Sequence, residues 1–170
     1  MPLIRSVTLG LAALLLASMT LLQSPTAKAD GTKLVSHPGW VVLETPYGFD
    51  DLVQRVQQSV KDQGMYLVTQ ASASQGAKGR GLTIPGNRIV GVYRNDYALR
   101  MLEADLAAGI EAPIRFYLTE DQDEDGGSTL SYKTPSTVFA PYMADGGAAL
   151  KTLAEELDQI FAEMAERAVK

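Results

Sequence analysis

The stretch from Arg80 to Asp96, R-G-L-T-I-P-G-N-R-I-V-G-V-Y-R-N-D, joins a glycine-rich basic loop to a run that alternates like a β-strand. In its second half, Val90, Val92 and Arg94 fall on one face of an extended chain. This alternation predicts a strand with a largely apolar face. It is the third strand that the pattern predicts, and the segments on either side decide what it pairs with.

The residues before this strand predict a strand, a helix and a second strand. Trp40 to Glu44 is a short β-rich run. From Phe49 to Gln63 the apolar residues recur at helical spacing, and Gly64 stands where a left-handed C-terminal cap is expected. Met65 to Gln70 is the second strand, and the small residues of Ala71 to Gly81 predict a flexible loop.

A second helix is predicted after the third strand. The Asn95–Asp96 pair offers N-cap side chains, and Gly109 is placed to close the helix. Leu99, Leu102 and Leu106 repeat at helical spacing. We expect these three leucines to face the core.

The last part of the chain predicts a hairpin and a long helix. Ile114 to Thr119 and Leu130 to Lys133 alternate as two strands that are joined by an acidic turn. Thr134 to Asp145 is expected to be irregular. Leu150 to Met164 then carries one apolar stripe of a helix.

The predicted element order is therefore β-α-β-β-α-β-β-α. The strand pairs are separated by turns too short for parallel crossovers, which favours antiparallel pairing. We expect an α+β fold with a single small domain, in which helices pack on one face of a largely antiparallel sheet, rather than a doubly wound parallel sheet.

The N-terminal residues have the order of a secretory signal. Arg5 precedes an apolar run from Val7 to Leu22, and the small-residue triplet A-K-A follows at residues 27–29. Because this run is shorter than the ~20 apolar residues that span a bilayer, residues 1–29 are predicted to be a cleaved signal peptide, with an uncleaved anchor as the alternative. Residues 30–170 then form a single periplasmic or secreted domain without stable membrane insertion.

Charge and cysteine content limit the class of partner. The chain has 15 basic and 20 acidic side chains, a net charge of −5, and removal of Arg5 and Lys28 with the signal leaves 13 basic residues and a net charge of −7. Phosphate backbones and anionic lipids repel an acidic protein, so neither nucleic acid nor a membrane surface is an expected partner. The chain has no cysteine and hence no disulfide framework.

Metal and cofactor chemistry is not expected. His37 is the only histidine and no thiolate is present, so the usual ligands of zinc, copper and iron are lacking. Asp121 to Gly126, D-Q-D-E-D-G, fits the first half of an EF-hand loop, but Tyr132 takes the twelfth position in place of the bidentate glutamate. We interpret the run as a solvated hairpin turn, and we assign no metal site, no cofactor and no catalytic residue.

Four residues are candidates for binding a ligand: Arg80, Arg88, Arg94 and Asn95. The glycines around Arg80 expose backbone donors, which suits either a flexible loop or a flap that contacts an anion. The guanidinium of Arg94 shares a face with apolar residues and needs a partner. That partner is Asp96 or a carboxylate of a second subunit in a structural interpretation, and a ligand anion in a functional one.

Four sequence features occur in a characteristic order. They are G-L-T-I-P at Gly81–Pro85, a strand that ends at Asn95, G-I-E-A-P-I-R-F-Y-L-T-E-D at Gly109–Asp121, and L-S-Y-K-T-P at Leu130–Pro135. In this order and spacing they resemble the domain of unknown function 302 family, from about Val41 to Tyr142. The resemblance implies a small α+β domain, often exported and dimeric, without an agreed biochemical role.

The chain departs from that family's pattern at three positions. Asp96 and Thr134 stand where relatives tend to carry proline and aspartate, and Ala73 lies where several carry a histidine. A role that rests on that imidazole or that aspartate is therefore not carried over to this chain.

Two classes of function follow from these observations. The first, which we prefer, is a non-catalytic exported homodimer that binds an unknown small ligand or an exported protein in a cleft between the 71–81 loop and the strand end at Arg94. The alternative is a cofactor-free enzyme in which Glu44, Tyr93 or Asp96 acts as acid or base. Arg94 would then stabilise a developing anion.

Overall fold

The computed structural model describes residues 34–122 and 126–170. Its elements are β1 (Trp40–Thr45), α1 (Phe49–Asp62), β2 (Tyr66–Ala71), α2 (Ala73–Lys78), β3 (Asn87–Tyr93), α3 (Asn95–Ala104), the 3-10 helix η1 (Ala107–Glu111), β4 (Ile114–Glu120), β5 (Ser128–Lys133), α4 (Pro135–Phe139), the 3-10 helix η2 (Ala140–Tyr142) and α5 (Met143–Val169). The predicted signal peptide, residues 1–29, lies outside the described residues. Within the described part, no helix has both the length and the hydropathy that crossing a membrane requires.

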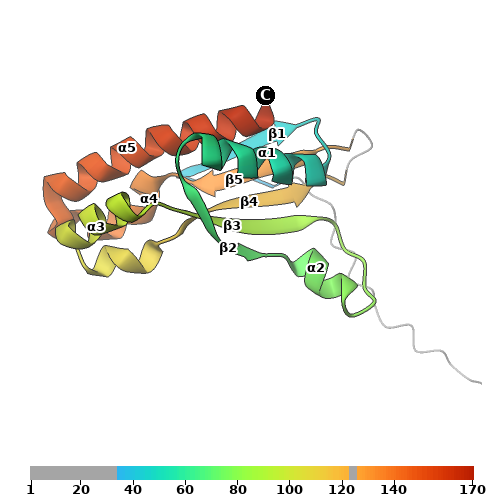
Figure 1. Ribbon diagram of the computed structural model, residues 1–170, viewed down its shortest axis with the longest axis horizontal. Helices are drawn as coiled ribbons and strands as arrows, with labels where there is room; N and C mark the ends of the chain where they lie inside the picture. The colour runs from blue at the N-terminus through green and yellow to red at the C-terminus, as the bar shows by residue number, and fades with distance from the viewer. Residues whose placement is uncertain (1–33, 123–125) are drawn as a thin grey trace, which may run out of the picture.

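The five strands form one antiparallel sheet in the order β1-β5-β4-β3-β2. Helices α1 and α5 lie together along one face of this sheet (Figure 1). Helix α5 extends along most of the length of the sheet. The chain is thus a single α+β domain with a long C-terminal helix, as the alternation of the strands and the absence of long crossovers predicted.

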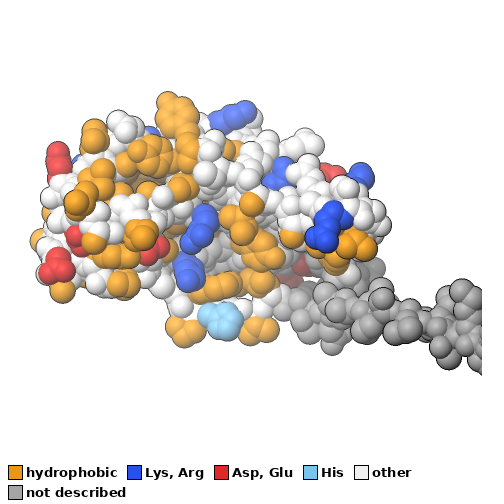
Figure 2. Space-filling view, turned by 90° about the horizontal axis from the view of Figure 1, so that it is seen from below, with side chains coloured by type: hydrophobic (Ala, Val, Ile, Leu, Met, Phe, Trp, Pro, Cys, Tyr) orange, Lys and Arg blue, Asp and Glu red, His pale blue; other side chains and the backbone are white. Residues whose placement is uncertain are grey.

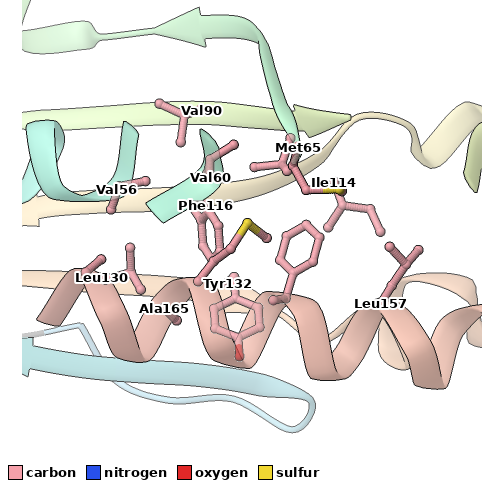
Figure 3. Close-up of a cluster of buried hydrophobic side chains, with 14 of the residues drawn as sticks. Val56, Val60, Met65, Val90, Ile114, Phe116, Leu130, Tyr132, Leu157 and Ala165 are labelled. Carbon is pink, nitrogen blue, oxygen red and sulfur yellow. The ribbon is translucent and has the colours of Figure 1, made fainter. Parts of the chain in front are cut away.

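The core fills the space between the sheet and the two long helices. Val90, Phe116 and Tyr132 lie side by side on adjacent strands because the registers of β3, β4 and β5 align them. Phe161 of α5 packs onto both aromatic rings, with centroid distances of 5.0 Å to Phe116 and 5.8 Å to Tyr132. Figure 3 shows Val90, Phe116 and Tyr132 among the buried side chains between the sheet and the helix. This cluster fastens α5 to the centre of the sheet.

The prediction for the second helix was wrong in three respects. Helix α3 ends at Ala104 rather than Gly109, and its N-cap residue is Arg94 rather than the Asn95–Asp96 pair. Its apolar stripe is also rotated: Ala98 and Met101 are buried, while the expected core leucines are exposed. These are Leu99 (53% exposed), Leu102 (41%) and Leu106 (79%). The two stripes lie one residue apart, or about 100° on a helix, and the smaller Ala98 allows the closer approach to α5.

Two segments that were expected to be irregular contain short helices. Residues 71–81 hold α2, whose N-cap Ser72 Oγ accepts a hydrogen bond of 3.1 Å from the backbone N–H of Gln75. Residues 134–145 hold α4, η2 and the start of α5, and Thr134 caps α4 with its side chain. In both cases a Ser or Thr cap stabilises a helix that is too short to show an apolar period.

We predict that Phe161→Ala lowers the free energy of unfolding by about 3–5 kcal/mol, the usual cost of removing a fully buried aromatic side chain. Phe161→Leu should lower it less, because more of the apolar volume remains. Urea denaturation followed by circular dichroism measures both changes. An alanine variant as stable as the wild type would show that this cluster does not fasten α5.

Candidate ligand-binding site on the open sheet face

The face of the sheet opposite α1 and α5 carries a row of unusual side chains. Trp40 of β1 pairs with Lys133 of β5, and Arg115 of β4 pairs with Gly91 of β3. The β4–β5 register places Arg115 beside Lys133. An indole, an ammonium and a guanidinium therefore follow one another across three adjacent strands, next to a residue without a side chain.

A cavity of about 220 Å³ lies over this row. A second row, with Ser131, Tyr117 and Ile89 on β5, β4 and β3, continues its floor. Val138 of α4 and Glu111 of η1 supply side walls. The complete lining is Trp40, Ile89, Glu111, Ile114, Arg115, Tyr117, Ser131, Tyr132, Lys133 and Val138. The floor is thus built by strands, and the rim by the short helices η1 and α4.

The aromatic wall of the cavity is held in place by its neighbours. His37 packs edge-on against Trp40 at a ring centroid distance of 5.1 Å, and Lys133 Nζ lies 5.9 Å from the centroid of the same indole. Across the cavity, Glu111 Oε1 accepts a hydrogen bond of 2.9 Å from the Tyr142 hydroxyl. That hydrogen bond raises the pKa of Tyr142, so this hydroxyl remains a proton donor to Glu111.

Arg115 and Lys133 make the site locally positive in an acidic protein. Both side chains are exposed, and no ion pair between residues of the described ranges includes either of them. Like charges on directly opposed strand residues repel each other and destabilise the sheet. An anion bound between the two cations would remove this cost, and the same arrangement gives two sets of charged hydrogen-bond donors for a carboxylate or sulfonate.

A second hollow extends this site toward α2. It is lined by Ala71, Ala73, Asn87, Ile89 and Tyr117, and it shares the last two residues with the main cavity. The Asn87 side chain holds α2 at the far end, because its Oδ1 accepts a hydrogen bond of 2.9 Å from the Ala73 backbone N–H. The open face therefore carries one groove that runs from η1 and α4 to α2.

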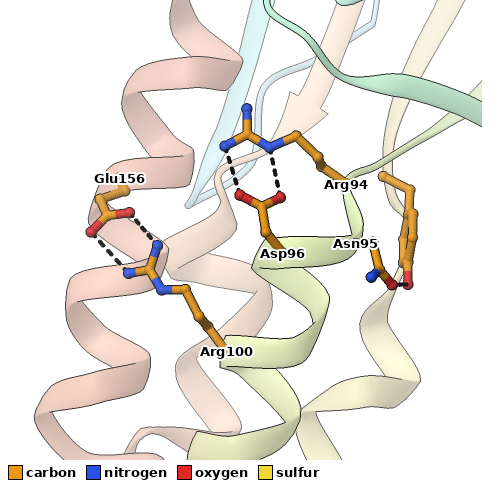
Figure 4. A network of polar contacts seen from close by, with 6 residues as sticks. Arg94, Asn95, Asp96, Arg100 and Glu156 are labelled. Carbon is orange, nitrogen blue, oxygen red and sulfur yellow. Dashed lines mark hydrogen bonds and ion pairs between the residues drawn. The ribbon is translucent and has the colours of Figure 1, made fainter.

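The predicted ligand residue Arg94 lies on the helix-covered side of the sheet. Its Nε and Nη2 donate hydrogen bonds of 2.8 and 3.1 Å to the two carboxylate oxygens of Asp96 (Figure 4). Its guanidinium carbon lies 4.4 Å from the centroid of the Tyr97 ring. The hydrogen bond from Arg94 lowers the pKa of Asp96. Asp96 is thus the partner that the apolar surroundings of Arg94 required.

The other three predicted ligand residues do not join Arg94 in a common site. Asn95 Oδ1 accepts a hydrogen bond of 3.4 Å from the Tyr93 hydroxyl. Arg80 is exposed after α2. Arg88 points to the helix-covered face, where Nη1 lies 3.4 Å from Gln70 Oε1 and the buried Nε has no partner among the described residues. Arg88 and Arg94 lie six residues apart on a strand, or about 20 Å.

Sequence reasoning therefore missed the residues that the structure does bring together: Trp40, Arg115 and Lys133. The signal that could have found them is the alternation of the hairpin. Arg115 and Lys133 flank the apolar positions Phe116 and Tyr132, so the sequence already places both cations on the face away from the core. Their adjacency, however, depends on the strand register, which no local pattern specifies.

The acidic turn lies partly outside the described residues, since residues 123–125 are not included. At its start, Asp121 Oδ1 accepts a hydrogen bond of 2.8 Å from Thr129 Oγ1. Within residues 34–122 and 126–170 there is no cluster of three or more histidine, cysteine or acidic side chains that could hold a metal ion.

A family model described as "Domain of unknown function DUF302" matches residues 41–168, and the chain belongs to this family. The match extends beyond the expected region and includes α5. The crystal structure of the uncharacterized conserved protein DUF302 from Bacillus stearothermophilus is similar, with a TM-score of 0.67 and 20% sequence identity over 78% of this chain and 99% of that one. At this identity the likeness shows a shared fold. No curated protein matches the chain.

Tyr132, between the cavity and the core, predicts a loss of stability at alkaline pH. Burial, assisted by the charges of Asp158 and Glu166, raises its pKa to about 12, whereas an unfolded tyrosine has a pKa of about 10. The native state keeps the proton more tightly, so this contribution is complete below pH ~10 and is lost as the pH rises toward ~12.

Urea denaturation at a series of alkaline pH values measures this effect. We expect the fall in the free energy of unfolding between pH ~10 and ~12 to be smaller in Tyr132→Phe than in the wild type. An identical fall in the two proteins would contradict the assignment to Tyr132.

Proposed function

We propose that this protein is a non-catalytic exported binding domain that holds a small organic anion on the open face of its sheet. The observation that carries the proposal is the pair of adjacent cations, Arg115 and Lys133, which lie beside the indole of Trp40 and form no ion pair with a residue of the described ranges. The acidic composition of the rest of the chain makes this local positive charge more distinctive.

The shape and lining of the cavity suggest the ligand's class. Ligand sites for drug-sized molecules measure about 300–1,000 Å³, so a cavity of about 220 Å³ suits a smaller molecule. The anionic group would lie between Arg115 and Lys133, while a flat apolar body would contact Trp40 and Ile89. We therefore favour an aromatic or short aliphatic carboxylate, sulfonate or related anion.

The alternative of acid–base catalysis draws less support from the geometry. The carboxylate of Asp96 accepts two hydrogen bonds from Arg94, and its lowered pKa makes it a weak base at neutral pH. The guanidinium assigned to stabilise an anion is thereby occupied. A binding role needs neither group.

Export and self-association complete the proposal. Removal of residues 1–29 would release the domain into the periplasm or the medium. An apolar stripe continues from α3 into η1, and its outermost members, Leu106 and Ile110, are 79% and 81% exposed. Such a stripe at one end of the molecule would be covered in a homodimer. Figure 2 shows apolar side chains gathered at the end that carries α3 and η1 in Figure 1.

Isothermal titration calorimetry with naphthalenesulfonate tests the binding site. We expect the double variant Arg115→Gln/Lys133→Gln to bind this anion at least about tenfold more weakly, because a hydrogen bond to a charged group contributes about 1.5–3 kcal/mol. The matched control Lys61→Gln/Lys151→Gln removes the same total charge from exposed helix positions and should bind like the wild type.

Naphthalenemethanol has the same apolar ring system as naphthalenesulfonate but no negative charge, so it measures the contribution of the anionic group. The wild type should bind it more weakly than the sulfonate. Equal affinity for the two compounds, or an equal loss in the control variant, would contradict an anion site at Arg115 and Lys133.

Analytical ultracentrifugation tests the dimer. Leu106→Glu/Ile110→Glu should shift the protein to monomers, because two charges cannot be buried unpaired in an apolar contact. Both side chains are exposed in the single chain, so its folding should be unaffected. A wild type that is monomeric at every concentration tested, or a variant that remains dimeric, would reject this interface.

A further inference from the structure

The segment between β2 and β3 differs in charge from the rest of the molecule. From Gln63 to Asn95 the chain contains no acidic residue but four basic ones: Lys78, Arg80, Arg88 and Arg94. All 20 acidic residues lie outside this segment. The first two of these cations belong to α2 and the loop after it, which project from one end of the sheet, away from α1 and α5 (Figure 1).

The same projection exposes apolar side chains. Leu82 is 56% exposed and Ile84 is 42% exposed, and helix α2 has no buried residue. No ion pair between described residues includes Lys78 or Arg80. In Figure 2, basic and apolar side chains lie next to each other at this end of the molecule. We call residues 72–85 the α2 projection.

The α2 projection is an ordered structure rather than a loose loop. Ser72 caps α2, and Asn87 of β3 fixes the start of the helix through the Ala73 N–H. After the helix, the Leu82 backbone N–H donates a hydrogen bond of 3.0 Å to Ala77 O, and Gly81 permits this turn with a φ of 75°. The apolar and basic side chains are thus presented with little conformational entropy left to lose on binding.

We propose that the α2 projection docks onto the surface of an anionic lipid bilayer. Lys78 and Arg80 would lie among the lipid headgroups, and Leu82 and Ile84 would enter the boundary of the acyl region, the combination typical of interfacial membrane contacts. A free anion is a poorer occupant, because exposed apolar side chains add nothing to its binding. The acidic body disfavours broad contact with such a surface and so restricts contact to this projection.

The neighbouring acidic group sets the limit of the contact. Glu120 Oε2 accepts a hydrogen bond of 2.6 Å from the Gly86 backbone N–H at the base of the projection. Its partner Gly86 directly precedes β3, so this carboxylate at the end of β4 lies where the projection joins the sheet. The expected orientation therefore places the α2 end toward the lipid and the sheet away from it. The expectation that membrane surfaces are not partners was based on net charge alone. Net charge does not detect that basic residues gather in the α2 projection.

Vesicle co-sedimentation of the processed chain, purified from the periplasm of an expressing bacterium, tests the proposal. The wild type should sediment with vesicles of phosphatidylcholine and phosphatidylglycerol, weakly with phosphatidylcholine alone, and less at high salt. Lys78→Gln/Arg80→Gln should lower the partition coefficient for the mixed vesicles by about tenfold or more. Leu82→Ser/Ile84→Ser should also lower it, because the apolar contact is lost.

The control Lys61→Gln/Lys151→Gln removes two exposed cations from α1 and α5 and should sediment like the wild type. Circular dichroism of the two projection variants and the control verifies the folding of all three proteins separately from the lipid contact. The proposal would be overturned if the wild type failed to sediment with anionic vesicles, if it sedimented equally with neutral ones, or if the control lost as much binding as the projection variants.

Discussion

Within residues 34–122 and 126–170, helices cover one face of the sheet and leave the other open, and the other features of the structure depend on this constraint. Burial of the covered face requires apolar side chains at every second strand position. The contact of Phe161 with Phe116 and Tyr132 is the point at which the long C-terminal helix meets those positions. Because side chains alternate along a strand, the same registers that build the core also determine which residues stand together on the uncovered face.

Small polar residues such as Ser131 share the uncovered face with a more unusual group of side chains. The face holds two adjacent cations, an indole and a glycine in one cross-strand row, and a cavity lies above them. Adjacent like charges cost stability, and the anion that we propose to bind between them would offset this cost. The α2 projection, at the other end of the groove, is a second locally basic region in an acidic protein.

The sequence predicted the parts of the structure that depend on local periodicity. The strands, the first and last helices, the antiparallel arrangement and the cap at Gly64, with its φ of 65°, all follow from the spacing of apolar residues and glycines. The buried face of helix α3 was predicted wrongly, because the apolar pairs Ala98/Met101 and Leu99/Leu102 both have helical spacing. Only packing against α5 decides which pair faces the core. The candidate site was not predicted, because Arg115 and Lys133 become neighbours only through the register of two strands. Resemblance to the family indicated the fold, but it did not identify the residues of a functional site.

The central claim is that the uncovered face is locally positive beside Trp40, although the chain as a whole is acidic. Trp40 is the only tryptophan, so quenching of its fluorescence by ions of opposite charge measures the potential at this position directly. The quenching constant of each ion is divided by its value for the neutral compound N-acetyltryptophanamide, which removes the intrinsic difference between iodide and caesium. The normalised constant should be larger for iodide than for caesium in the wild type, and Arg115→Gln/Lys133→Gln should remove that preference. A larger normalised constant for caesium in the wild type, as the net charge alone would give, would contradict the account.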